Sequence, residues 1–144
     1  MLGVVGPQKV DPDLIGILDG VHEVLRISEP YKRASRTFKP EDTVVSVGDV
    51  RIGGDEVIVM AGPCSAETEE QVHASAAAVK KAGAKILRGG AFKPRSSPYS
   101  FQGLGEEGLK MMRDACKTEG MALVTEVMDV SQIELIGQYA DIYQ

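Results

Sequence analysis

The sequence lacks the features that would place it at a membrane, on nucleic acid or in the secretory route. No apolar run approaches the roughly 18 residues needed to span a bilayer. Net charge is -5, and lysines and arginines are scattered among the acids, so no basic tract suits nucleic acid or anionic lipid. The N-terminus has no basic segment followed by a long apolar stretch, as a secretory signal would. These absences favour a cytoplasmic protein without nucleic-acid or membrane partners.

Cysteine is also scarce. Cys64 and Cys116 are the only two, too few for a disulfide framework, so we expect reduced thiols. Cys116 lies in the middle of an expected helix, where a buried packing role is favoured. Cys64 follows a strand and a Gly-Pro turn, where a thiolate can bind a soft or borderline divalent metal or act as a nucleophile. Burial of Cys64 as a small apolar residue is an equal alternative.

The first 42 residues differ in pattern from the rest. Residues 1–29 contain a short β-like run, a helix expected over Pro12–Leu18 with Asp11 as N-cap, and an alternating strand expected over Val21–Ser28. This mixture is typical of part of a small α+β domain. Residues 30–42 are polar, contain two prolines and indicate a linker. Two short β runs on either side of Gly48-Asp49 then predict a β-hairpin.

Beyond residue 55, strands and helices alternate with short connections. The expected strands are Val57–Ala61, Lys85–Leu87, Met121–Val127 and Asp141–Tyr143. The expected helices are Thr68–Ala82, Gly105–Glu119 and Ser131–Tyr139, the last with Ser131 as its cap. This order predicts an α/β fold with a parallel sheet, either a doubly wound open sheet or a (β/α)8 barrel. No Gly-x-Gly-x-x-Gly motif follows the first strand, which disfavours a dinucleotide fold.

The loop over Arg88–Ser97, RGGAFKPRSS, carries the strongest chemical signal. Arg88, Lys93 and Arg95 place three cations within eight residues, and these repel one another unless anions lie among them. Two glycines let a ligand approach the backbone, and a proline stiffens the loop. Arginine holds phosphate or carboxylate bidentately, and lysine adds a compact charge. The loop therefore predicts a site for a phosphorylated or carboxylated small molecule, with a solvated basic loop as the weaker alternative.

Two further polar side chains end strands at the same edge. Glu126 ends the third of these strands, where it can orient a ligand or metal-bound water or pair with an arginine. Gln144 ends the fourth at the equivalent height. His22 and His73 are interpreted as ordinary surface or packing residues.

Five runs in the sequence together resemble 3-deoxy-D-arabino-heptulosonate 7-phosphate (DAHP) synthase, of the subfamily with a small N-terminal ferredoxin-like regulatory domain. The runs are PYKRASRTFKPEDTVV, AGPCSAE, LRGGAFKPRSSPYSFQGLGEEGL, VTEVMD and YADIYQ, in family order and spacing. The resemblance implies the first half of a (β/α)8 TIM barrel in residues 43–144, after part of the ferredoxin-like domain in 1–29. It implies condensation of phosphoenolpyruvate with erythrose 4-phosphate, the entry step of the shikimate pathway, by a cytoplasmic homo-oligomer.

The resemblance also implies roles for the matching side chains. Cys64 is expected to be the thiolate ligand of a divalent metal such as Mn, Fe, Co or Zn. Lys93 and Glu126 are the expected catalytic residues. Phosphoenolpyruvate is expected on Arg88 and Lys93, and the sugar phosphate along Lys93 to Ser96 with its phosphate group on Arg95. The expected substrate-binding set is Arg88, Lys93, Pro94, Arg95, Ser96 and Gln144.

The family's other metal ligands, a histidine, a glutamate and an aspartate, belong to later strands that this sequence does not contain. We therefore expect the 144-residue chain to be part of a barrel and inactive by itself. Two alternatives stay open. One is a related synthase that condenses phosphoenolpyruvate with arabinose 5-phosphate to 3-deoxy-D-manno-octulosonate 8-phosphate. The other is a non-catalytic module that only holds a phosphorylated ligand.

Overall fold

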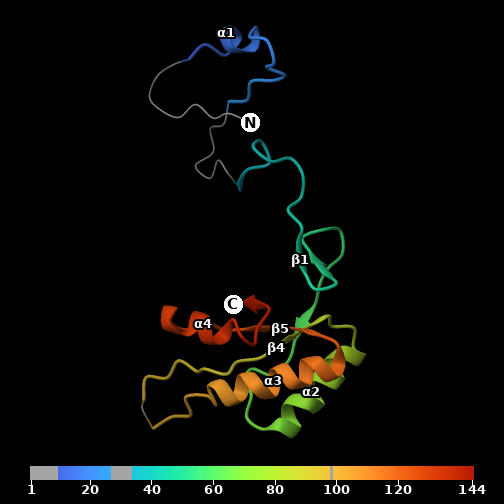
Figure 1. Cartoon of the computed structure of the whole chain (residues 1–144), viewed down its shortest axis with the longest axis vertical. Coiled ribbons are helices and arrows are strands. Elements are labelled where there is room, and N and C mark those ends of the chain that lie inside the picture. The colour runs from blue at the N-terminus through green and yellow to red at the C-terminus, as the bar shows by residue number, and fades with distance from the viewer. Residues whose placement is uncertain (1–9, 27–33, 98) are drawn as a thin grey trace. The chain divides into compact units, whose positions relative to one another are not determined.

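The computed structural model describes residues 10–26, 34–97 and 99–144 (Figure 1). The chain divides into two compact units, residues 1–42 and 43–144, each of which is described separately. Among the described residues, no helix has both the length and the hydrophobicity that a membrane crossing requires.

The first unit contains the short helix α1, Pro12–Gly16. Asp11 caps it by accepting the Asp13 N–H at 3.0 Å, and Pro12 takes the first turn, as predicted. The strand predicted over Val21–Ser28 is wrong for residues 21–26, which have no regular structure, while residues 27 and 28 lie outside the described part. Alternation alone does not make a strand, because its backbone groups need a neighbouring strand to pair with. The β-like run at the N-terminus also lies outside the described residues, and the ferredoxin-like assignment stays a prediction.

The second unit begins with two short strands, β1 (Val45–Val47) and β2 (Val50–Ile52). They pair antiparallel, with Val47 opposite Val50 across the Gly48-Asp49 turn. Gly48 has a φ of +55°, a left-handed conformation that glycine adopts without strain.

A parallel sheet of four strands follows, in the order in which they occur along the chain. Its strands are β3 (Met60–Ala61), β4 (Ile86–Arg88), β5 (Ala122–Thr125) and β6 (Ile142–Tyr143). This confirms the predicted mixed α/β fold with a parallel sheet, and the closure into a barrel stays a prediction. The first strand is shorter than predicted: residues 57–59 lie outside it, and Val57 is 87% exposed.

Helices connect these strands. α2 (Glu69–Lys81) has Thr68 as N-cap, and α3 (Glu106–Glu119) ends at Gly120, whose φ is +61°. The 3-10 turn η2 (Val130–Gln132) leads into α4 (Ile133–Ile136). The cap predicted at Ser131 is wrong, since Asp129 caps this turn by accepting the Ser131 N–H at 2.9 Å. The Gln132 side chain accepts the Asp129 N–H in return, at 3.3 Å, which completes a capping box.

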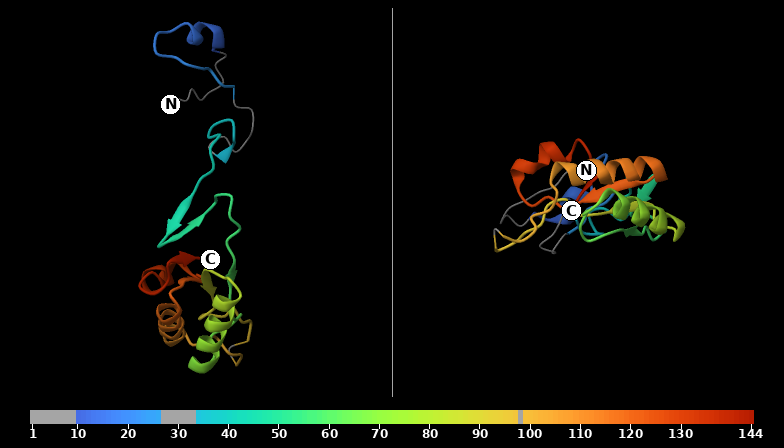
Figure 2. Two further views of the ribbon diagram at one scale, coloured as in Figure 1. Left: turned by 90° about the vertical axis from the view of Figure 1, so that its right-hand side faces the viewer. Right: turned by 90° about the horizontal axis from the view of Figure 1, so that it is seen from below.

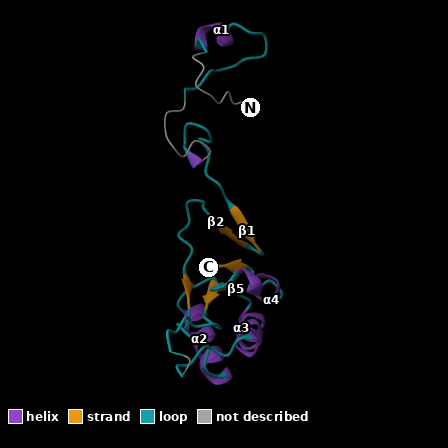
Figure 3. Ribbon diagram, turned by 90° about the vertical axis from the view of Figure 1, so that its left-hand side faces the viewer, coloured by secondary structure: helices purple, strands orange, loops and turns teal. Residues whose placement is uncertain are grey.

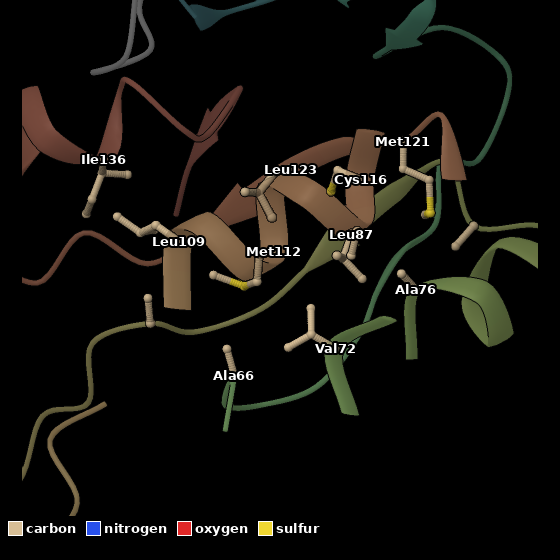
Figure 4. Close-up of a cluster of buried hydrophobic side chains, with 13 residues drawn as sticks. Ala66, Val72, Ala76, Leu87, Leu109, Met112, Cys116, Met121, Leu123 and Ile136 are labelled. Carbon is tan, nitrogen blue, oxygen red and sulfur yellow. The ribbon is translucent and has the colours of Figure 1, made fainter. Parts of the chain in front are cut away.

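The core lies between the sheet and the helices α2 and α3, which run side by side in two views (Figures 2 and 3). Leu87 and Leu123 are neighbours in the sheet and are fully buried against these helices (Figure 4). Cys116 joins them from α3, and burial raises the pKa of its thiol to about 12, so the predicted packing role is confirmed. Because side chains alternate along a strand, Arg88 and Val124 point to the other face of the sheet, away from the helices that cover Leu87 and Leu123.

Candidate functional site

Polar side chains follow all four strands of the parallel sheet at one edge. Arg88 ends β4, and Cys64 lies in the loop after β3. The register pairs Arg88 with Val124 and Val124 with Ile142. Glu126 and Gln144 each lie two residues further along their strands, so both share the face of the sheet to which Arg88 points. The parallel order therefore brings residues that are far apart in sequence to one place.

Arg88 lies at the centre of this group. Its Nε donates to Oε1 of Gln144 at 3.0 Å, and its Nη1 donates to the backbone oxygen of Cys64 at 3.3 Å. Its Nη2 is 3.2 Å from Oε1 of Glu126. These three contacts fix the plane of the guanidinium, and about a quarter of the Arg88 side chain remains exposed to solvent.

Lys93 reaches the same group from the loop after β4. Its ammonium donates to the backbone oxygen of Cys64, lies 3.6 Å from the Cys64 Sγ and is 3.8 Å from Oε2 of Glu126. Only 6% of its side chain is exposed, and a buried ammonium is costly unless it is paired. The carboxylate of Glu126 therefore supplies one anionic partner to this cationic loop.

A glycine makes the approach of Lys93 sterically feasible. A Cβ at Gly90 would lie 2.5 Å from the Lys93 Nζ and 2.7 Å from the Cys64 oxygen, closer than such atoms approach. Any larger residue at Gly90 would force Lys93 out of its place.

The charges of this group are unbalanced. Arg88 and Lys93 supply two positive charges, and Glu126 supplies the single carboxylate in contact with them. The half-buried cluster of Arg88, Lys93 and Glu126 thus keeps one net positive charge, and a small anion is the ligand that such a site favours.

The rest of the basic loop does not join the cluster. Pro94, Arg95 and Ser96 are all exposed, and the Nε of Arg95 donates to the backbone oxygen of Phe101 at 3.4 Å. A residue missed from the sequence, Gln102, holds the loop by donating to the backbone oxygens of Ser97 and Ser100 at 3.1 and 3.2 Å. These hydrogen bonds form only in the folded loop, so no sequence pattern predicts them.

The donor set around Cys64 fits one metal ligand and not a complete coordination shell. The thiol is free and exposed at the sheet edge, as a ligand must be. Within the described part of the chain, one group of three potential metal-ligating side chains is found, and Cys64 does not belong to it. The group consists of Glu69, His73 and Asp114. His73, interpreted as an ordinary residue, therefore has charged neighbours that the sequence analysis missed.

The chain matches the family described as DAHP synthetase I over residues 32–144. It is 46% identical to the phospho-2-dehydro-3-deoxyheptonate aldolase of Thermotoga maritima, over 100% of this chain and 43% of that protein. It is 32% identical to a 2-dehydro-3-deoxyphosphooctonate aldolase of Fusobacterium nucleatum, over 69% of this chain and 39% of that protein. The chain spans less than half the length of these curated relatives.

Two solved structures resemble this chain as well. The crystal structure of the Thermotoga maritima DAHP synthase superposes with a TM-score of 0.78 and 45% identity, covering 98% of this chain and 41% of that chain. A truncated form of the Thermotoga maritima synthase gives a TM-score of 0.66 at 44% identity, over 76% of this chain and 38% of that chain.

Proposed function

The chain belongs to the DAHP synthetase I family, and from this premise we propose that it carries the phosphoenolpyruvate-binding part of a synthase. The reaction proposed for the whole protein is the condensation of phosphoenolpyruvate with erythrose 4-phosphate to DAHP. The observation that carries the proposal is the convergence of Arg88 and Lys93 on one sheet edge, with one net positive charge.

Phosphoenolpyruvate suits this cluster because it presents a carboxylate and a phosphate on one small carbon frame. Arg88 can hold either group bidentately, and its plane is already set by Gln144 and Glu126. Lys93 adds a point charge on the same side. Arg95, Ser96 and Pro94, exposed on the same loop, are proposed to meet the phosphate end of the sugar.

The proposed chemistry forms one carbon–carbon bond and releases one phosphate. C3 of phosphoenolpyruvate attacks the aldehyde carbon of the sugar, and the aldehyde oxygen takes a proton from the ammonium of Lys93. Water adds at C2 and gives a proton to Glu126. The bond between C2 and the bridging phosphate oxygen then breaks, and the new C2 hydroxyl gives its proton to the departing phosphate and becomes the ketone. Glu126 also keeps Arg88 and Lys93 in place, at 3.2 and 3.8 Å.

We propose Cys64 as one ligand of the family's divalent metal, with the other ligands in the part of the relatives that this chain does not span. When bound, such a metal supplies a Lewis acid for the aldehyde carbonyl of the sugar. The exposure of Cys64 at the sheet edge and the family membership support this assignment, and the identity of the metal is left open.

The (β/α)8 barrel is likewise proposed for the whole protein. Four parallel strands in chain order, with helices on one face, repeat the strand–helix unit from which such a barrel is built. The homo-oligomer, the cytoplasmic location and a ferredoxin-like regulatory domain in residues 1–29 are proposed on the resemblance.

The choice of sugar tests the function of the whole protein. With phosphoenolpyruvate and a divalent metal present, we expect phosphate release with erythrose 4-phosphate to be at least a hundredfold faster than with arabinose 5-phosphate. A discrimination of this size corresponds to about 3 kcal/mol between the two transition states. Measuring released phosphate and product with each sugar decides the question.

The second candidate is the arabinose 5-phosphate enzyme, favoured by the 32% identity to the Fusobacterium nucleatum aldolase. Faster turnover of arabinose 5-phosphate would replace the first proposal by this one. Phosphoenolpyruvate binding without phosphate release from either sugar would instead support a non-catalytic binding module.

A further inference from the structure

A second group of polar side chains lies between α2 and α3. Glu69 and His73 are four residues apart in α2, so they share one face of that helix, and Asp114 faces them from α3. One ligand atom from each of the three lies within 4.8 Å of the other two. The helices pack on the face of the sheet opposite to Arg88, so this group is separate from the proposed substrate site.

The spacing of the group matches metal coordination. His73 Nε2 and Asp114 Oδ2 are 3.4 Å apart. Two ligands of a tetrahedral zinc ion with bonds near 2.0–2.1 Å are separated by about 3.3 Å. Glu69 is exposed, and its carboxylate lies within 4.8 Å of the other two ligand atoms, so it is placed to supply a third ligand.

The charges around the group also require a cation. Glu69 and Asp114 bring two carboxylates together, and among the described side chains no lysine or arginine forms an ion pair with either. Two cations on α3 are engaged elsewhere: Lys110 with Glu106 and Glu107, and Arg113 with Asp141 at 2.8 Å. A divalent ion offsets this negative charge.

Solvent reaches the group through an open hollow at the start of α2. Its lining consists of Thr68, Glu69, Glu70 and His73. About a third of the His73 side chain is exposed, and that of Asp114 is mostly exposed. An ion can therefore enter without any movement of the helices, and water can fill the remaining coordination positions.

We propose that Glu69, His73 and Asp114 bind a divalent transition-metal ion, with Zn²⁺ as the best match, that clamps α2 to α3. One nitrogen and two oxygen ligands suit Zn²⁺, whereas Mg²⁺ and Ca²⁺ take six or more oxygens. Because the three side chains meet only in the folded chain, zinc binding stabilises the fold. The inference does not rest on the synthase reaction.

The test is a calorimetric Zn²⁺ titration of the full chain carrying Cys64→Ser, which removes the other proposed metal ligand. We expect one saturable site, and a rise of about 5 °C or more in the unfolding midpoint when zinc is a hundredfold above its dissociation constant. His73→Ala and Asp114→Asn should each weaken binding at least tenfold and reduce the rise by about half or more at the same zinc concentration. Mg²⁺ at the same concentration should give none.

The matched control is Glu70→Gln, which removes an acid from the same hollow but not from the ligand group. It should bind zinc as tightly as the Cys64→Ser parent. Circular dichroism in chelator checks that each variant folds, and either ligand variant that folds decides the question. The proposal is overturned if the parent takes up no saturable zinc, or if the folded ligand variants bind it as tightly as Glu70→Gln does.

Discussion

Replacing Lys93 by alanine is expected to lower kcat/KM of the whole protein for phosphoenolpyruvate by about a thousandfold, a loss within the range for a proton donor in the transition state. Its ammonium is almost entirely buried, contacts Cys64 through both the backbone oxygen and the sulfur, and faces Glu126. The variant loses a binding charge and the proposed proton donor, and it leaves Glu126 with one cation fewer. Steady-state phosphate release at varied phosphoenolpyruvate measures the effect.

The control for this variant is Lys110→Ala. Lys110 lies on the exposed surface of α3 and pairs with Glu106 and Glu107, contacts that contribute little to stability at a surface. The kcat/KM of the Lys110→Ala variant should stay within about twofold of the parent value, as expected for a charge that is remote from the strand ends. If Lys93→Ala also kept its activity within threefold, Lys93 could be neither a substrate ligand nor a catalytic residue.

Replacing Leu123 by alanine is expected to reduce the free energy of unfolding by about 2–5 kcal/mol. Leu123 is fully buried on β5, which pairs with β4 on one side and β6 on the other. Its side chain belongs to the core shared with α2 and α3, so truncation removes apolar contacts and leaves a cavity in the middle of the layer (Figure 4). Urea unfolding followed by circular dichroism gives the difference.

Val130→Ala is the matched control for the core, because Val130 is also an aliphatic residue of the parallel-sheet unit but is 81% exposed. Its free energy of unfolding should change by no more than about 0.5 kcal/mol. Equal losses in the two variants would mean that the sheet and helices do not enclose the core described above.

The sequence was a good guide where local chemistry decides the structure. Thr68 and Gly120 mark the start of α2 and the end of α3 because a hydroxyl cap and a left-handed glycine act within one turn. Asp129 was missed in favour of Ser131 because both residue types are good caps and the two lie only two residues apart. The predicted strand is wrong over residues 21–26 because an alternating pattern says nothing about a neighbouring strand to pair with.

The candidate site was predictable in outline because parallel strands end at one edge. That rule brings Cys64, Arg88, Glu126 and Gln144 together once the strands are recognised. The burial of Lys93 over Gly90 could not be predicted, since it depends on the path of the loop. The meeting of His73 with Asp114 depends on how two helices pack, which helical periodicity does not specify.

The central claim is that the cluster of Arg88, Lys93 and Glu126 binds phosphoenolpyruvate, and calorimetric titration of phosphoenolpyruvate into the whole protein tests it most directly. The parent should show one saturable site per chain. Arg88→Ala should weaken binding at least a hundredfold, because a half-buried charge-assisted contact is lost and Glu126 remains to repel the ligand. Binding to Arg88→Ala as tight as to the parent would contradict the account.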